Sequence, residues 1–268
     1  MNKIEVLVAT MHQNNFKLVK EMNLNTDTII INQCEKNEYD ERIINNNKVR
    51  MYSYNERGLA RSRNRALDKT KADICVIADD DVIYVDKYEE IILNAFEKQE
   101  DADLIIFNIK ILNPNRQGSI ITENKKINFF NYMKYGSCRI AFRKSRVDKY
   151  NIRFDELFGA GATYTSGEDT IFMNDCLKHG LKIYTCPDTI AYVKQDTSSW
   201  FNGYNEKYFF DKGAIFARIN KKISMLYNIQ FSLRKYSIYK NDIKFINVIK
   251  QLTNGRRDYL NKINKFRV

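Results

Sequence analysis

A short, wholly apolar run that ends in three aspartates constrains the fold of this chain more than any other feature. Residues 74–78 read Ile-Cys-Val-Ile-Ala and are followed directly by Asp79, Asp80 and Asp81. An uninterrupted apolar run of this length predicts a strand that is buried on both faces. In open α/β sheets, ligands bind at the carboxyl ends of such strands. The run therefore predicts an α/β fold with acidic residues at its ligand-binding edge.

Strands and helices are predicted to alternate along the first half of the chain. Short apolar runs with β-branched residues predict strands, and apolar residues spaced at the helical period predict helices between them. This order is typical of a mostly parallel, Rossmann-like sheet with helices on both faces. The predicted strands are 4–9, 28–32, 49–54, 74–78, 104–111, 139–142, 182–186 and 190–193, and the predicted helices are 12–22, 59–70, 86–99 and 169–179.

The composition changes near residue 200, which predicts a first domain over 1–200 and a helical, basic extension over 201–268. Residues 200–268 carry 15 lysines and arginines but 4 aspartates and glutamates, whereas residues 1–199 carry 29 of each kind. Such a surface fits a solvated face, an anionic membrane or nucleic acid, although no nucleic-acid-binding motif is present. Two amphipathic helices are predicted from the spacing of Ile215, Ile219, Ile223, Leu226 and Tyr227, and of Tyr239, Ile243, Ile246 and Ile249.

The sequence contains no recognisable targeting or membrane-spanning segment. No stretch approaches the roughly 18–20 apolar residues of a transmembrane helix, and the first ten residues lack the apolar core of a signal peptide. The five cysteines are widely spread and form no zinc or redox motif. We therefore expect a cytoplasmic protein whose basic extension is a candidate contact to the inner face of the membrane. No oligomeric state is indicated.

The aspartate cluster itself predicts a cation. Three adjacent carboxylates repel one another unless something positive neutralises them. Hard divalent ions prefer oxygen ligands, and Mg²⁺ or Mn²⁺ keeps coordination positions free for phosphate oxygens. Asp79, Asp80 and Asp81 are therefore predicted to bind a divalent metal or a phosphorylated ligand. The alternative is an acidic, solvated turn.

Five segments, taken in order, resemble the family 2 glycosyltransferases of the GT-A fold. The strand that ends at Asp79-Asp80-Asp81 resembles the family's metal-binding strand, and Gly167-Glu168-Asp169-Thr170 resembles its Glu-Asp motif. The resemblance covers roughly residues 3–200 and is greatest to bacterial enzymes that assemble capsular or surface polysaccharides. The other three segments are Val6-Leu7-Val8-Ala9-Thr10, Ile29-Ile30-Ile31-Asn32-Gln33 and Asn55-Glu56-Arg57-Gly58-Leu59-Ala60-Arg61-Ser62-Arg63-Asn64.

This resemblance implies an inverting transfer of a sugar from a nucleotide-diphosphate sugar, expected to be a UDP-sugar, to a lipid-linked glycan acceptor. Asp169 is then the general base, while Asp79 and Asp81 hold Mn²⁺ or Mg²⁺. Glu168, in the same motif, is implied to contact the acceptor, and Trp200 is a separate candidate, as a stacking platform for a sugar or lipid acceptor. The donor contacts implied by the same motifs are Thr10, Asn32, Asn55, Arg61, Arg63, Asp79 and Asp80.

Several of these residues also have a structural interpretation. Ser166-x-x-Asp169 reads as a capping box, which would make Asp169 a helix-capping partner instead of a base. Arg61 and Arg63 also fit a solvated helix surface. Trp200, the only tryptophan, also fits core packing at a domain edge.

The sequence departs from the family pattern at two places. Asn32 stands where the family usually has an aspartate that faces the base, and no histidine follows the last strand, which leaves Asp196 as a substitute or the metal with fewer ligands.

Two rival functions share the fold. One is a catalytically inactive GT-A-like binding module. The other is a nucleotidyltransferase that makes sugar nucleotides, but it needs a glycine-rich loop after the first strand, and residues 9–15 contain no glycine.

Overall fold

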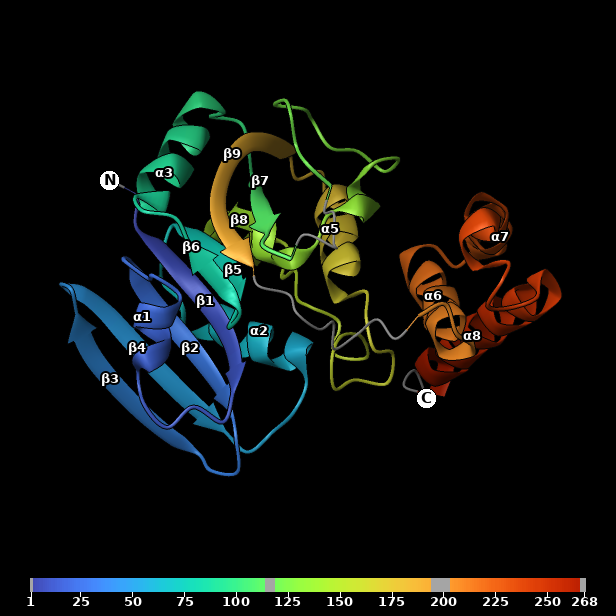
Figure 1. Cartoon of the computed structure of the whole chain (residues 1–268), viewed down its shortest axis with the longest axis horizontal. Coiled ribbons are helices and arrows are strands. Elements are labelled where there is room, and N and C mark those ends of the chain that lie inside the picture. Colours follow the sequence, from blue (N-terminus) through green and yellow to red (C-terminus); the bar gives the residue numbers. More distant parts are fainter. Residues whose placement is uncertain (1, 114–118, 194–202, 266–268) are drawn as a thin grey trace.

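The computed structural model describes residues 2–113, 119–193 and 203–265, and within them the chain folds around a nine-stranded sheet (Figure 1). The strands follow the order β3-β4-β2-β1-β5-β8-β7-β9-β6 across the sheet. Their bounds are β1 (Ile4–Met11), β2 (Asp27–Gln33), β3 (Glu38–Ile44), β4 (Asn47–Tyr54), β5 (Ile74–Asp79), β6 (Val82–Tyr84), β7 (Leu104–Ile111), β8 (Ile140–Arg143) and β9 (Ile183–Val193).

The half of the sheet that holds β4, β2, β1 and β5 is parallel, as predicted. In its register Thr10 lies beside Asn32, and Ala9 lies beside Asp79, so these strands end at one common edge. The other half is mixed, because β8 runs antiparallel to both of its neighbours. The two strands predicted over 182–186 and 190–193 form the single strand β9.

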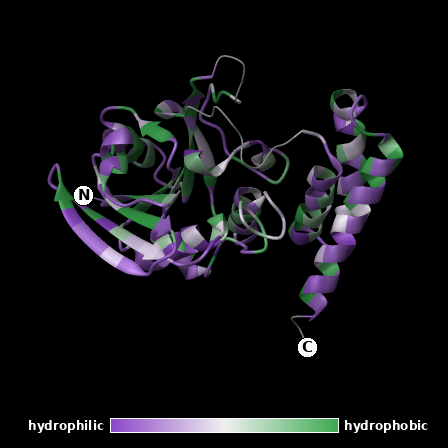
Figure 2. Cartoon of the chain, turned by 60° about the horizontal axis from the view of Figure 1, so that its bottom comes forward, coloured by the Kyte–Doolittle hydropathy of each residue, from purple (hydrophilic) through white to green (hydrophobic). Residues whose placement is uncertain are grey.

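Two strands were not predicted: β3, which lacks an apolar run, and β6, which is too short to show a pattern. β3 lies at the edge of the sheet, and five of its seven residues are exposed. Figure 2 shows it as largely hydrophilic beside the hydrophobic central strands. β6 has only three residues. Neither pattern is separable from a loop by periodicity.

Helices cover both faces of the sheet, as predicted. Alternate residues of β1 point to opposite sides: Val6 and Val8 pack in one core cluster with α1 (Lys17–Glu21) and α3 (Tyr88–Lys98). Leu7 packs in a second cluster with α2 (Leu59–Lys69) and α5 (Glu168–Lys178). A further short helix, α4 (Lys144–Lys149), packs through Val147 in that second cluster.

The helix predicted over 12–22 is confined to α1, because the start of this segment is a loop. His12 has a left-handed backbone with φ of 56°. The buried Asn32 amide then bonds both backbone groups of Gln13, accepting from its N–H and donating to its C=O at 2.9 Å each. These bonds satisfy the backbone outside a helix and hold the loop against the end of β2.

The basic extension folds into three helices, not two: α6 (Glu206–Ile219), α7 (Ser224–Tyr239) and α8 (Phe245–Lys265). Both predicted helices were wrong in their bounds. The first joined Ile219, the last residue of α6, to residues of α7, and the second joined Tyr239, the last residue of α7, to residues of α8 across a turn. The helices α6 and α8 cross closely: a Cβ on Gly213 would lie 1.9 Å from the Leu252 carbonyl oxygen, and a Cβ on Gly255 would lie 1.8 Å from that of Phe210. Their shared core contains Phe209, Phe216, Phe231, Tyr239, Val248 and Leu252.

Candidate active site

The strand ends bring the first group of predicted residues together. Thr10 at the end of β1 donates a hydrogen bond of 2.6 Å from its hydroxyl to Oδ2 of Asp80. Gln13 donates in turn from Nε2 to the Thr10 hydroxyl at 3.1 Å. The contact joins residues 70 positions apart in the chain. It holds one aspartate of the cluster against the neighbouring strand, although both Asp80 and Asp81 are exposed.

Arg63 joins this edge to the predicted Glu-Asp motif. Its guanidinium is buried, and Nη1 donates to Glu168 Oε1 at 3.0 Å and to Asp169 Oδ1 at 2.6 Å. Nη2 donates to Asp79 Oδ1 at 3.0 Å. We call these four residues the Arg63 cluster. One arginine from α2 thus bridges the end of β5 and the start of α5.

The charges of the Arg63 cluster do not cancel, because three carboxyl groups share one guanidinium. Burial alone would lower the pKa of Arg63, but the carboxylates of Asp169, Asp79 and Glu168 outweigh it and raise the pKa, so the arginine stays protonated. Burial and the neighbouring Asp169 raise the pKa of Glu168 to about 7, against the opposing effect of Arg63. Glu168 can therefore carry the proton that relieves the excess negative charge near neutral pH.

Asp169 is the more accessible acid of the pair on α5. Its side chain is 21% exposed, whereas that of Glu168 is 8% exposed. The helix begins after Gly167, which caps it without a side-chain hydrogen bond, so the capping-box interpretation of Ser166 and Asp169 was wrong. A Cβ on Gly136 would lie 4.0 Å from Asp169 Oδ2, so the glycine leaves room beside this carboxylate. The Asp169 carboxylate thus combines partial exposure with a hydrogen bond from Arg63.

The aspartates offer the chemistry of a divalent-metal site without a complete set of protein ligands. Partial loss of hydration and the nearby carboxylates of Asp79 and Asp80 raise the pKa of Asp81. Within the described ranges 2–113, 119–193 and 203–265, no group of three or more His, Cys, Asp or Glu side chains is arranged to hold a metal ion. A cation at Asp79 and Asp81 would need further oxygen ligands, such as phosphate oxygens.

The structure does not bring the remaining predicted residues into this group. Asn32 is fully buried, with its amide bonded to Gln13 and to the Ser53 hydroxyl at 3.0 Å. Arg61 points outward and pairs with Glu156 at 3.0 Å. Asn55 is exposed beyond the end of β4, where its backbone N–H donates to Asn37. Trp200 and Asp196 lie outside the described residues.

Two other residues near the Arg63 cluster were not predicted. Gly136 belongs to an irregular segment without periodicity, and no local signal distinguishes it. Lys212 of α6 approaches from the C-terminal helices: burial lowers its pKa, while Glu168 and Asp211 act in the opposite direction. Only the tertiary structure shows that α6 lies beside α5.

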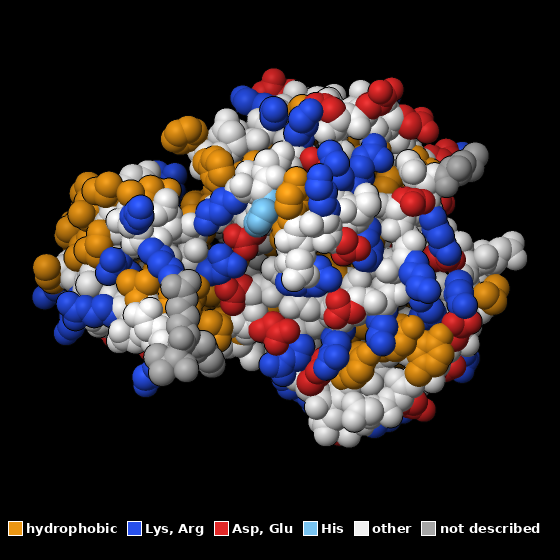
Figure 3. Space-filling view, turned by 180° about the vertical axis from the view of Figure 1, so that it is seen from behind, with side chains coloured by type: hydrophobic (Ala, Val, Ile, Leu, Met, Phe, Trp, Pro, Cys, Tyr) orange, Lys and Arg blue, Asp and Glu red, His pale blue; other side chains and the backbone are white. Residues whose placement is uncertain are grey.

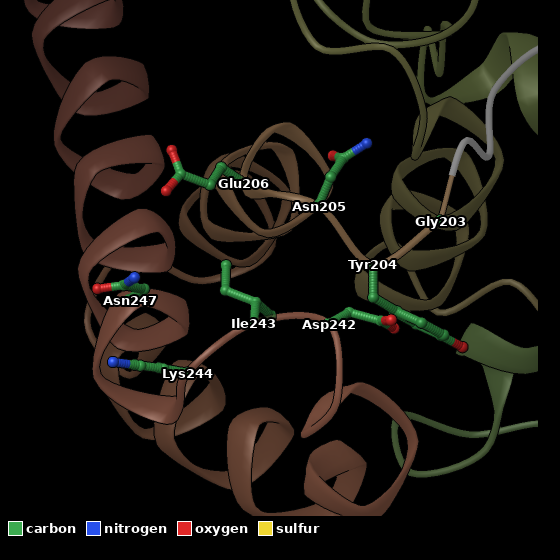
Figure 4. A pocket seen from close by; sticks show the side chains of 8 residues that line it. All are labelled: Gly203, Tyr204, Asn205, Glu206, Asp242, Ile243, Lys244 and Asn247. Atoms are coloured by element: carbon green, nitrogen blue, oxygen red, sulfur yellow. The ribbon is translucent and has the colours of Figure 1, made fainter.

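A pocket of about 710 Å³ lies elsewhere, between the start of α6 and the turn that joins α7 to α8 (Figure 4). None of the strand-end aspartates or Arg63 cluster residues lines it. It is therefore separate from the site described above. Its lining includes Tyr204, Asn205, Glu206, Asp242, Lys244 and Asn247.

Comparison with known proteins agrees with this fold. A family model described as glycosyl transferase family 2 matches residues 3–154. The chain also resembles a crystal structure of S. aureus TarS 1–349 in complex with UDP-GlcNAc, with a TM-score of 0.66 and 16% identity over 96% of this chain and 80% of that chain. The TarS 1–349 complex with UDP gives a TM-score of 0.63 and 13% identity over 94% and 80% of the two chains. No curated protein matches in sequence. The likeness confirms the predicted fold.

Proposed function

Because this chain belongs to glycosyl transferase family 2 and is a glycosyltransferase with the GT-A fold, we propose that it transfers a sugar from a UDP-sugar to a glycan acceptor with inversion. The observation that carries this proposal is the Arg63 cluster, which sets Asp169 beside the aspartates at the end of β5. The donor class is supported by the UDP and UDP-GlcNAc complexes of the TarS structures that this chain resembles. The proposed acceptor is a lipid-linked precursor of a surface polysaccharide.

The residues of the site divide the proposed reaction between them. The donor lies across the ends of β1 and β5, where Thr10 fixes Asp80. Asp169 takes the proton of an acceptor hydroxyl as its oxygen attacks the anomeric carbon from the face opposite the diphosphate. The new C–O bond forms while the bond to the leaving diphosphate breaks, so the anomeric configuration inverts. Arg63 holds Asp169 and Asp79 in fixed positions, which supplies the orientation that such a displacement needs.

The oxygen-only chemistry of Asp79 and Asp81 fits Mg²⁺ or Mn²⁺, and these two residues are the ones that would hold it. When bound, the metal supplies Lewis-acid stabilisation of the charge on the leaving diphosphate. The protein would provide two carboxylates to such a metal, and further oxygen ligands would come from the donor phosphates.

Asp81→Asn is expected to weaken UDP binding in the presence of Mn²⁺ by tenfold or more, because it removes one of two carboxylates that hold the metal. The side chain is exposed in the free protein, so the melting temperature should not fall. Titration calorimetry with UDP, with Mn²⁺ and with EDTA, measures the effect. Glu97→Gln, an exposed acid on α3, is the charge-matched control. Equal UDP affinity in Mn²⁺ and EDTA would rule out the metal.

We further propose that the C-terminal helices rest on an anionic membrane surface through α7. Apolar residues spaced along one side of this helix are exposed: Leu226 by 65% and Leu233 by 62%, with Ile229 and Tyr236 between and after them. Hydrophobic side chains and lysines or arginines gather together on this end of the molecule (Figure 3, left). No helix in the described part of the chain is long and apolar enough to span a bilayer. An amphipathic helix with basic flanks is suited to lie in the interface instead.

Replacing Leu226 and Leu233 together by Glu is expected to abolish most binding to vesicles that contain anionic lipid. Each leucine contributes on the order of 2 kcal/mol when its side chain leaves water, and the new charges are repelled by the lipid. Co-sedimentation at low and high salt measures the binding. Ile43→Glu on the exposed edge strand β3 is the matched control. If the double variant binds these vesicles as well as the wild type does, the membrane contact does not lie on this side of α7.

A further inference from the structure

The loop that leads into α5 is held by the C-terminal helices. Gly167, directly before Glu168, has φ of 107°. A Cβ added there would lie 2.4 Å from Cδ1 of Ile215 on α6. The side chain of Ile215 thus occupies the space where Gly167 has no side chain. The helix α6 therefore packs directly on the backbone that precedes Asp169.

A buried carboxylate on α6 makes the second contact with this loop. Asp211 is 1% exposed, and its Oδ2 accepts from the Thr165 backbone N–H at 3.0 Å and from the Thr165 hydroxyl at 2.7 Å. Its Oδ1 accepts from Lys207. A buried carboxylate is costly unless several donors satisfy it. Asp211 meets that condition by binding Thr165, four residues before Asp169 in the chain.

Further contacts fix the loop and α5 against the same helices. The Tyr164 hydroxyl donates to Asp258 of α8 at 2.8 Å. Arg218 of α6 donates from Nε to Asp155 at 2.6 Å and from Nη2 to Asp175 at 2.7 Å. Both ends of the segment from 155 to 175 are thereby tied to α6, and its middle is tied to α8. The start of α5 has little freedom to move independently of the C-terminal helices.

We infer that Asp211 is a positioning residue for catalysis, which sets the approach of Asp169 to the acceptor hydroxyl through Thr165 and Gly167. The inference rests on the proposed role of Asp169 as the base. It makes α6 a part of the catalytic unit, although its sequence lies in the basic extension. A base must lie within hydrogen-bonding distance of the proton that it takes. A displacement of about 1 Å at a reacting group can cost a hundredfold in rate. A shift of this loop should therefore lower kcat more than it weakens donor binding.

Asp211→Asn and Thr165→Val test the inference with two different changes. The first removes the charge of Asp211, and the second removes only the Thr165 hydroxyl while keeping the backbone N–H. Each is expected to lower kcat for transfer by about tenfold to a hundredfold. The donor KM and UDP affinity should stay unchanged, because Thr10 and the strand-end aspartates are untouched. Thr165→Ser keeps the hydroxyl and should retain the wild-type kcat.

Val248→Ala is the control for a merely structural role. Val248 lies in the core shared by α6, α7 and α8, so the change destabilises these helices through their own packing. It should lower the melting temperature but preserve kcat at a temperature where the protein stays folded. Unchanged kcat in both Asp211→Asn and Thr165→Val would overturn the inference, as would an equal loss of kcat in Val248→Ala. Wild-type turnover is measured first, and its absence would overturn the proposed function together with this inference.

Discussion

Asp169→Asn is expected to lower the rate of sugar transfer by about 10²- to 10⁴-fold, the range that general-base catalysis commonly contributes. The amide has the shape of the carboxylate, and its oxygen can still accept the hydrogen bond from Arg63 Nη1. It cannot take the proton of the acceptor hydroxyl. The donor should therefore bind as before, and the loss should appear in kcat.

The measurement compares kcat, donor KM and UDP affinity in the variant and the wild type. Glu156→Gln is the control, because Glu156 is an exposed acid paired with Arg61 outside the Arg63 cluster. It should change none of the three quantities appreciably. A parallel collapse of UDP affinity and melting temperature in Asp169→Asn would assign Asp169 a structural role in place of a catalytic one.

Arg63→Met is expected to destabilise the protein by about 3–5 kcal/mol near neutral pH, the usual cost of removing one partner from a buried ionic group. The change leaves Asp79, Glu168 and Asp169 without the cation that they share. Arg63→Lys keeps the charge but cannot reach three carboxylates with one ammonium group. It should fall between the wild type and the methionine variant.

The stability loss of Arg63→Met should depend on pH, and the pKa of Glu168 gives the sign of this dependence. In the wild type, the pKa of Glu168 is about 7 in the folded state, above its ordinary value. A raised carboxyl pKa contributes stability at low pH that is lost as the pH rises through the folded pKa. Arg63 opposes this rise, so removing the arginine should raise the pKa of Glu168 further. The loss of unfolding free energy in Arg63→Met, relative to the wild type, should therefore grow as the pH rises from about 5 to 8. Urea unfolding at both pH values tests this, and a deficit that does not grow with pH would contradict the shared-charge account.

The fold could be predicted from the sequence because its central strands are continuously apolar. Residues 4–9, 28–32 and 74–78 lie in β1, β2 and β5, and their common edge follows from their parallel order. The edge strand β3 could not be predicted, since a strand exposed over most of its length carries no apolar signal. The breaks between α6 and α7 and between α7 and α8 were also missed, because apolar residues on both sides of each break fit one helical period.

The candidate site was predictable where its chemistry is local. The aspartates at the end of β5 could be recognised in the sequence, because they follow an apolar run. The position of Arg63 depends instead on a contact with a residue 106 positions away in the chain. One signal did exist: Ala60, Arg63 and Leu67 lie on one side of α2, and all three are buried. An arginine on the apolar side of a helix is best explained by buried acidic partners. Arg61, on the other side, pairs with an exposed glutamate instead.

The boundary predicted near residue 200 stays a prediction, and it rests on a change in charge and in helical pattern. The structure shows that Phe158, Tyr164 and Ile171 share a hydrophobic cluster with Ile215 and Ala217 of α6. A change in composition marks a change in surface character, and it need not mark an independently folding unit.

The most direct test of the central claim is the turnover of nucleotide sugars by the purified wild-type chain. UDP-, GDP- and CMP-sugars are each incubated with the protein in Mn²⁺, Mg²⁺ or EDTA, and the released nucleotide is quantified. We predict release of UDP from at least one UDP-sugar, dependent on the divalent metal and strongly reduced in Asp169→Asn. If UDP binds but no donor is turned over under any of these conditions, the chain is a binding module with the fold of a glycosyltransferase, and the proposed mechanism is wrong.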